Sequence, residues 1–365
     1  MAETKPTRHT VQTTHHIFFS DSSAMTAIPD ASVHLVVTSP PYPMIQMWDA
    51  LFCSDPRVAK ALENQDGRLS FALMHEALDQ IWREVFRVLV PGGFACINIG
   101  DATRTLDNAF CLYPNHSRVL SAMQEVGFSV FPPILWRKPT NSPNKFMGSG
   151  MLPPGAYVTL EHEYILIFRK GEKRGFNTPE EKINRQRSAF FWEERNHWFS
   201  DVWMDLRGIR QTTHSRKVRD RSGAYPFELA YRLVNMFSVM NDTILDPFLG
   251  TGTTLVAAMA SGRNSIGYEL DPSFASLIRE NIMQGVEPAR HQAAGRIQNH
   301  LAFVKKREAA GKPLKHVNTV YGFPVVTQQE IRLVLPVLAC VDEVAENRFG
   351  ATYDLDRVAL RNITI

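Results

Sequence analysis

Four consecutive residues, Ser39-Pro40-Pro41-Tyr42, have the groups needed to hold and orient a flat aromatic amine. The lone pair of such an amine is delocalised into its ring, so the nitrogen reacts well only when hydrogen-bond acceptors hold its protons. The Ser39 hydroxyl and the Pro40 carbonyl can be those acceptors, and the prolines stiffen the segment without adding an N–H donor. Tyr42 offers a face on which a flat ring can stack. Taken alone, the tetrapeptide is more typical of an ordinary rigid turn.

A second segment, residues 244–254, predicts a ligand site built largely from backbone. An apolar strand ends at Asp246, and a tight turn through Gly250 and Gly252 leads into a helix from Thr253. This arrangement lets a ligand approach the backbone at the carboxyl edge of a sheet. Glu269 lies about twenty residues further on, at the end of the next strand, where it can accept both ribose hydroxyls of a nucleotide. A glycine turn also occurs where a strand simply packs against a helix. Together with Glu269, the turn leaves three candidate cofactors: nicotinamide, flavin and S-adenosylmethionine.

The pairing and order of these two segments resemble the DNA amino-methyltransferases of the beta class, in which the catalytic tetrad precedes the cofactor loop. The matching segments are Thr38-Ser39-Pro40-Pro41-Tyr42 and Asp246-Pro247-Phe248-Leu249-Gly250-Thr251-Gly252-Thr253. The resemblance implies an α/β, Rossmann-like S-adenosylmethionine-dependent methyltransferase fold with circularly permuted motif order. Its sheet would be mostly parallel with an antiparallel edge hairpin. The implied reaction is direct methyl transfer to an exocyclic amine of a base flipped out of double-stranded DNA.

The resemblance also assigns roles to individual residues. The implied catalytic residues are Ser39, Pro40, Pro41 and Tyr42. The implied cofactor-binding residues are Asp21, Asp246, Phe248, Gly250, Gly252, Thr253, Glu269 and Phe227. Asp21 would lie near the adenine ring of the cofactor, although it follows Ser20 where many relatives have glycine. It also fits a turn residue or helix cap.

The expected target is cytosine N4, because serine at the first tetrad position is associated in the family mainly with that amine. Adenine N6 is the alternative, and a non-catalytic DNA-binding protein that keeps the fold is a second one. Cytosine C5 methylation is disfavoured because it needs a cysteine nucleophile in a Pro-Cys turn. None of the four cysteines follows a proline: Cys53, Cys96, Cys111 and Cys340. Protection of host DNA beside a restriction endonuclease is expected from the family association alone.

Length and composition are those of a globular protein with one large core, since 44% of the 365 residues are hydrophobic. The cysteines form no CxxC pair and no Cys/His ligand spacing, so no metal site is expected. The sequence has no apolar stretch suited to a membrane span and no signal-peptide core in its first residues. A cytoplasmic, DNA-associated prokaryotic protein is therefore expected, either a monomer or a homodimer.

The distribution of charge is more informative than the net charge of +3. Residues 169–221 contain 14 Lys and Arg against 8 Asp and Glu, interleaved with aromatics. Phosphate neutralisation and base reading there would make residues 172–223 a DNA target-recognition region; a solvated charged face is the alternative. The basic residues proposed for it are Arg185, Arg187, Arg195, Arg207, Arg210, Arg216, Lys217 and Arg219. A second candidate for DNA contact, or an exposed helix face, contains Arg296, Lys305, Lys306 and Arg307.

Alternating strands and helices predict an open sheet with helices on both faces. The predicted strands are 16–20, 33–38, 94–99, 164–168, 243–248 and 265–270. The predicted helices are 71–89, 253–260, 273–283 and 289–308, with a further helical pattern near 330–344. The expected division is a catalytic half (15–171), the target-recognition region (172–223), a cofactor-binding half (224–284) and a C-terminal extension (285–365).

Overall fold

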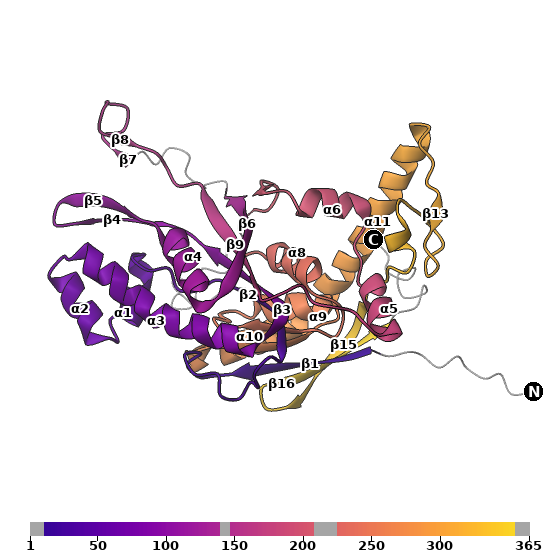
Figure 1. Ribbon diagram of the computed structural model, residues 1–365, viewed down its shortest axis with the longest axis horizontal. Coiled ribbons are helices and arrows are strands. Elements are labelled where there is room, and N and C mark those ends of the chain that lie inside the picture. The colour runs from indigo at the N-terminus through magenta and orange to yellow at the C-terminus, as the bar shows by residue number, and fades with distance from the viewer. Residues whose placement is uncertain (1–10, 139–146, 208–224, 355–365) are drawn as a thin grey trace, which may run out of the picture.

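A ten-stranded mixed sheet forms the centre of the described part of the chain (Figure 1). The structure is a computed structural model and describes residues 11–138, 147–207 and 225–354. The strand order is β10-β6-β9-β3-β2-β11-β12-β1-β16-β15. Five middle strands pair in parallel: β3 (Leu89–Ile99), β2 (Val33–Thr38), β11 (Thr243–Asp246), β12 (Asn264–Tyr268) and β1 (Val11–Phe18).

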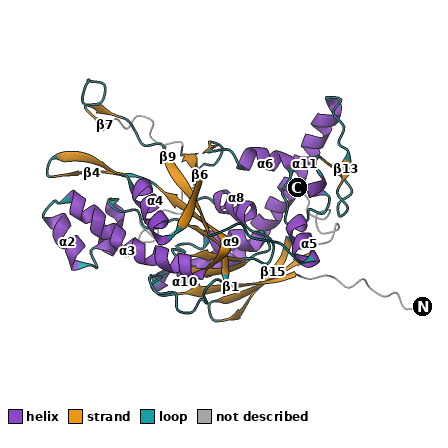
Figure 2. Ribbon diagram, viewed as in Figure 1, coloured by secondary structure: helices purple, strands orange, loops and turns teal. Residues whose placement is uncertain are grey.

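The middle strands are apolar because helices cover both faces of the sheet (Figure 2). In β2, Leu35 and Val37 belong to the core on one face, and Val36 belongs to the core on the other. Successive side chains of a strand point to opposite faces, so a continuous apolar run is what such a strand requires. The covering helices include α3 (Gly67–Val88), α4 (Asn115–Val126), α8 (Phe227–Phe237) and α9 (Thr253–Ala260). The predicted α/β class is confirmed.

Antiparallel strands complete both edges of the sheet. Next to β3, β9 (His162–Lys170) and β6 (Phe128–Arg137) form the predicted antiparallel hairpin, and the short β10 (Val202–Trp203) pairs in parallel with β6. At the other edge, β16 (Arg348–Asp354) pairs antiparallel with β1, and β15 (Val337–Ala345) pairs with β16. The segment predicted as a C-terminal extension therefore contributes two strands to the main sheet.

The helical prediction near residues 330–344 is wrong. The chain makes one short 3₁₀ turn, Gln328–Glu330, and then enters β15. Pairing with its neighbour β16 supplies backbone partners to this segment, which forms the edge of the sheet, and the strand is rich in valine, which suits a pleated surface. The other predicted elements are present with shifted ends. For example, α3 begins at Gly67, where the Asp66 carboxylate caps the helix by accepting from the Leu69 N–H at 3.0 Å.

Smaller elements project from the body around the sheet. The hairpin of β7 and β8 rises at one end, and the end of α11 rises with β13 at the other (Figure 1). Among the described residues, no helix is long and apolar enough to span a membrane. The remaining elements are α1 (Asp49–Phe52), α2 (Pro56–Glu63), β4 (Ala102–Leu106), β5 (Ala109–Tyr113), β7 (Met147–Gly148), β8 (Ala156–Tyr157), α5 (Pro179–Arg187), α6 (Trp192–Trp198), α10 (Ala275–Gln284), α11 (Val286–Ala309), β13 (His316–Val317) and β14 (Pro324–Val325), with 3₁₀ turns at Gln46–Trp48 and Pro272–Phe274.

Candidate active site

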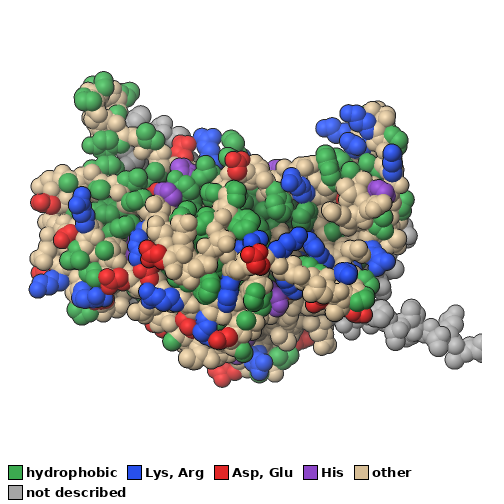
Figure 3. Space-filling view, in the orientation of Figure 1, with side chains coloured by type: hydrophobic (Ala, Val, Ile, Leu, Met, Phe, Trp, Pro, Cys, Tyr) green, Lys and Arg blue, Asp and Glu red, His purple; other side chains and the backbone are tan. Residues whose placement is uncertain are grey.

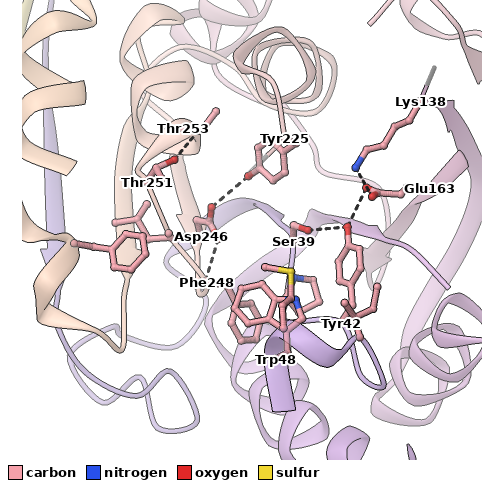
Figure 4. A pocket seen from close by; sticks show the side chains of 16 residues that line it. Ser39, Tyr42, Trp48, Lys138, Glu163, Tyr225, Asp246, Phe248, Thr251 and Thr253 are labelled. Carbon is pink, nitrogen blue, oxygen red and sulfur yellow. Dashed lines mark hydrogen bonds and ion pairs between the residues drawn. The ribbon is translucent and has the colours of Figure 1, made fainter. Parts of the chain in front are cut away.

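The tetrad and the glycine loop line one cavity, although they lie far apart in the sequence. They follow β2 and β11, which are parallel neighbours in the sheet, so their carboxyl ends meet at one edge. The cavity has a volume of about 240 Å³. Ser39 and Tyr42 lie across it from Asp246 and Phe248 (Figure 4). The juxtaposition expected of the two segments is therefore present.

The predicted site residues divide into two groups. Those that line the cavity are Ser39, Pro40, Tyr42, Asp246, Phe248, Gly250 and Thr253. Those that do not are Pro41, Asp21, Gly252, Glu269 and Phe227. The second group supports the loops or lies further from the cavity. The lining residues absent from the predicted set include Tyr225, Lys138, Glu163, Trp48 and Phe274.

Asp246 fixes the junction between the two segments. Its buried carboxylate accepts hydrogen bonds from Thr38 Oγ1 at 2.6 Å, Thr254 Oγ1 at 2.6 Å, the Phe248 N–H at 3.0 Å and Tyr225 Oη at 3.3 Å. Burial raises the pKa of Asp246, and these hydrogen bonds oppose that rise. The carboxylate thus ties β2 to the start of α9 and holds the loop beside the tetrad.

The glycine loop has the backbone shape of a ligand cradle. Gly250 and Gly252 have φ values of +55° and +86°, and Gly252 caps the N-terminus of α9. At Gly250 an added Cβ would meet nothing nearer than 4.0 Å, so the backbone faces open space. At Gly252 it would lie 3.2 Å from Ile278 Cγ2, so this glycine serves helix packing as well.

Glu269 joins the loop to the end of β12. Its Oε2 accepts from the Gly250 N–H at 2.8 Å and its Oε1 from the Asp271 N–H at 2.9 Å. Burial raises the pKa of this carboxyl group, while the two backbone hydrogen bonds lower it. A carboxylate has about four acceptor positions, so two remain for ribose hydroxyls. The loop and this acid fit the adenosine part of S-adenosylmethionine.

Two other predicted cofactor contacts are less directly placed. Asp21 is exposed, and its Oδ1 accepts from the Ser23 N–H at 2.8 Å, which is the arrangement of a turn residue. Phe227 packs on Tyr231 with ring centroids 5.5 Å apart. Tyr225, two residues earlier, lines the cavity instead and was available as a signal in the same Tyr-Pro-Phe segment. The cofactor roles of Asp21 and Phe227 remain predictions.

A polar relay connects the tetrad to the antiparallel hairpin. Ser39 Oγ donates to Tyr42 Oη at 3.1 Å, and Tyr42 Oη donates to Glu163 Oε2 at 3.0 Å. Asn98 Nδ2 donates to the same two oxygens, at 2.8 and 2.7 Å, and Lys138 forms an ion pair with Glu163 Oε1. Burial and the nearby Glu163 carboxylate raise the pKa of Tyr42 well above its usual value. Figure 4 shows Ser39, Tyr42, Glu163 and Lys138 in sequence along one wall.

The arrangement of this relay leaves an acceptor at the cavity. The proton of Ser39 is committed to Tyr42, and that of Tyr42 to Glu163. The lone pairs of Ser39 Oγ are then free to accept an amine N–H. The sequence placed Asn98 in the predicted strand 94–99, and it gave neither Asn98 nor Glu163 a part in the site.

The basic residues predicted to contact DNA, and the tryptophans interleaved with them, have different environments. Trp198 and Trp203 are buried, whereas Trp192 is half-exposed. The prediction for Arg296 is wrong: it is buried and forms an ion pair with Glu194, with Nε and Oε1 2.6 Å apart. The exposed basic residues among the candidates are Arg185, Arg195, Arg207, Lys305 and Lys306, with Arg187 and Arg307 half-buried. The others lie outside the described residues: Arg210, Arg216, Lys217 and Arg219.

No group of three His, Cys, Asp or Glu side chains in the described ranges is arranged to hold a metal ion. The four cysteines are free, and Cys96 is buried in the sheet.

The fold and the cavity define a Rossmann-like transferase with a nucleotide-cofactor loop beside an amine-orienting tetrad. The N6/N4 DNA methylase family matches residues 33–280 of this chain, and the chain belongs to that family. This membership confirms the predicted methyltransferase fold and its cofactor, S-adenosylmethionine. The enzyme is a DNA methyltransferase.

Two relatives show how far the similarity extends along the chain. Type II methyltransferase M.MthZI of Methanothermobacter thermautotrophicus is 52% identical over 330 residues, covering 89% of this chain and 92% of the relative. Type II methyltransferase M.MjaI of Methanocaldococcus jannaschii is 50% identical over 284 residues, covering 74% of this chain and 92% of the relative.

Solved structures are similar over the same core. A Thermus thermophilus protein described as a DNA modification methylase, complexed with S-adenosyl-L-methionine, has a TM-score of 0.59 and 33% identity, covering 74% of this chain and 94% of that one. The cytosine-N4-specific PvuII DNA methyltransferase has a TM-score of 0.51 at 17% identity, covering 73% and 86%. The second likeness concerns the fold alone.

Proposed function

We propose that this protein methylates cytosine N4 at a specific site in double-stranded DNA and that it protects host DNA from a restriction endonuclease. The relatives named as Type II methyltransferases support the second part. The first part rests on one observation: Ser39 Oγ, an acceptor whose own proton is engaged, faces the cavity beside the glycine loop. Serine at this position favours cytosine N4, because in the family Asp or Asn is commoner with adenine N6.

The tetrad prepares the amine for direct attack. S-adenosylmethionine, when bound, supplies an electrophilic methyl group together with its own leaving group. Ser39 Oγ and the Pro40 carbonyl accept hydrogen bonds from the two N–H groups of the target amine. This orients the nitrogen lone pair toward the methyl donor. The Tyr42 ring, held at its hydroxyl by Asn98 and Glu163, forms the wall against which the flipped base stacks.

The relay also receives the proton that the amine must lose. As the new N–C bond forms, one amine proton passes to Ser39 Oγ, the serine proton passes to Tyr42 Oη, and the tyrosine proton passes to Glu163 Oε2. Each oxygen gains and loses one proton except Glu163, which ends protonated and releases its proton to solvent. The Tyr42 phenol need not ionise, which suits its raised pKa. The Lys138 ammonium pairs with the other carboxyl oxygen of Glu163, Oε1.

Duplex DNA would lie on the face that bears the projecting elements. The exposed residues Lys305 and Lys306 near the end of α11, and Arg195 on α6, supply positive charge. Figure 3 shows Lys and Arg side chains gathered on the projection at the upper right. Residues 172–223 remain the proposed target-recognition region, with 285–365 as the second source of DNA contact. Residues 15–171 supply the catalytic half and 224–284 the cofactor half in this proposal. The location would be the prokaryotic cytoplasm, where the DNA is.

Mass spectrometry of nucleosides tests the proposal. Purified protein is incubated with unmethylated genomic DNA and S-adenosylmethionine carrying a labelled methyl group, and the DNA is then digested. N4-methylcytosine is the expected product. N6-methyladenine would overturn the choice of base while keeping the enzyme class. No labelled nucleoside would support the non-catalytic alternative.

A further inference from the structure

Two adjoining hairpins present an exposed apolar surface that no part of the described chain covers. We call it the apolar crest. Met151, Leu152 and Val158 between β7 and β9 are 82%, 71% and 89% exposed. The crest also contains Tyr157, Phe110 and Leu112, all exposed. In Figure 3 it is the hydrophobic projection at the upper left, opposite the Lys- and Arg-bearing projection at the upper right. Contiguous exposed apolar surface of this kind marks an interaction site.

The crest is rooted at the target pocket. Its β7–β8 part lies between β6 and β9, and the residues that flank the root of this part, Lys138 and Glu163, both line the cavity. Their ion pair joins the two sides of the root, and so does a backbone hydrogen bond from the Lys138 N–H to the Glu161 carbonyl at 2.7 Å. A base held in the pocket therefore lies at the foot of the crest.

The two hairpins of the crest are held together at their apolar side chains. The ring of Phe110, on β5, stacks on that of Tyr157, on β8, with centroids 4.6 Å apart and planes 9° apart. The β4–β5 hairpin thus supports the β7–β8 segment, which carries the most exposed side chains. The crest is a joint surface of two hairpins.

The composition of the crest selects its partner. Residues 147–160 contain no Lys, Arg, Asp or Glu, so the segment offers no positive charge to phosphates. Its apolar side chains suit the faces of stacked bases. Extruding a base from a duplex leaves a base-sized opening in the stack, and apolar wedges inserted between base steps fill such openings.

We propose that the apolar crest inserts into the DNA base stack at the opening left by the target base, with Met151 and Leu152 leading. The proposal rests on the proposed function, because it requires an extruded base in the pocket. The crest would lower the free energy of the flipped state, and the basic projection opposite would hold phosphates. One enzyme face would then combine an apolar contact to bases with an ionic contact to the backbone.

A double variant, Met151→Ser with Leu152→Ser, tests the proposal. Two unmethylated duplexes contain the sequence that the wild-type enzyme methylates, as mapped on its product. In the first duplex the target base is paired. In the second its partner is replaced by an abasic position. On the paired duplex we expect single-turnover methylation to fall about tenfold or more; on the abasic duplex, where extrusion costs less, it should stay within about twofold of wild type. Fluorescence of 2-aminopurine at the target position reports extrusion without turnover and should fall in the variant. Val344→Ser, which changes a 67% exposed side chain on β15, is the matched control.

Other outcomes would overturn the proposal. Equal loss on both duplexes would indicate damage to the pocket, and no loss on either would mean that the crest does not contact the stack. Sedimentation of wild type as a dimer and of the double variant as a monomer would assign the crest to a second copy of the chain. If wild-type protein methylates no DNA, the proposed function fails and the proposal for the crest fails with it. If wild-type protein methylates DNA and the double variant loses nothing on either duplex, the proposal for the crest fails alone.

Discussion

Replacing Glu163 by Gln removes the charge that sets the direction of the relay while keeping the size of the side chain. Both carboxylate oxygens act as acceptors. Oε2 accepts hydrogen bonds from Tyr42 Oη and Asn98 Nδ2, and Oε1 forms the ion pair with Lys138. Glutamine has only one oxygen. Its NH₂ group must therefore face either Asn98 or the Lys138 ammonium, which are both donors. Tyr42 then has no fixed hydrogen-bond acceptor. Ser39 is no longer held in the orientation in which its lone pairs can accept the amine N–H.

The size of the effect follows from the bonds that are lost. One charge-assisted hydrogen bond in a side chain that is 13% exposed contributes about 1.5–3 kcal/mol. At 1.36 kcal/mol for each factor of ten, the methyl-transfer rate should fall about 10- to 100-fold. The loss belongs to the transfer step, because Glu163 orients the tetrad and lies on the hairpin away from the glycine loop. The KM for S-adenosylmethionine should stay within about twofold.

The assay is single-turnover transfer of a labelled methyl group to a duplex, together with the melting temperature of each variant. Glu161→Gln is the matched control, because Glu161 pairs with Arg137 at 3.0 Å near the root of the same hairpin but outside the cavity. The control should retain the wild-type rate. A Glu163→Gln enzyme that kept more than half of the wild-type rate, with an unchanged melting temperature, would refute the relay. A lower melting temperature with a parallel loss in the control would assign the effect to the fold.

Three further variants test the rest of the site and the fold. Ser39→Ala removes an amine acceptor, so transfer should fall about 100-fold while calorimetric binding of S-adenosylhomocysteine is kept; full turnover would exclude the hydroxyl. Glu269→Gln retains an oxygen for the Gly250 N–H but loses charge at the ribose, so the same calorimetry should show about 10-fold weaker binding. Burial lowers the pKa of His15 to about 3. As the pH falls below about 6.5, His15 is protonated in the unfolded chain but stays neutral in the folded protein, so the free energy of unfolding decreases. Wild type should lose about 1.4 kcal/mol more unfolding free energy than His15→Gln between pH 7.5 and 5.5, measured by urea denaturation.

The tetrad and the loop could be predicted because each is a short run of residues whose chemistry is local. Ser39 and Tyr42 are three residues apart and form a hydrogen bond with each other. Gly250 and Gly252 have positive φ, which a tight turn needs and glycine adopts without steric cost. Their meeting at one sheet edge followed from the pattern of buried parallel strands. Residue types and strand order were sufficient for this part of the site.

Glu163, Asn98 and Lys138 could not be predicted as site residues because sheet register brings them to Tyr42. The register pairs Glu163 with Trp136 on β6, and Asn98 with Ile165 on β9. A shift of one residue would turn each side chain to the other face of the sheet. The register of two paired strands cannot be predicted from the residues of either strand alone. The same reason accounts for the wrong prediction at β15, where an available sheet edge determined the conformation.

The placement of β1 has a consequence for how this enzyme is made. Its neighbours in the sheet are β12 and β16, and the hydrogen bond between Thr13 and Tyr353 joins residues 340 positions apart. Contacts of such long range form slowly and only after the distant segment exists. When the ribosome has synthesised the tetrad and the glycine loop, β16 has not yet been made. The first strand, β1, then lacks one of its two neighbours in the sheet. We expect methylation to begin only after β16 has been synthesised, so a nonsense codon between residues 337 and 348 should be as inactivating as an earlier one.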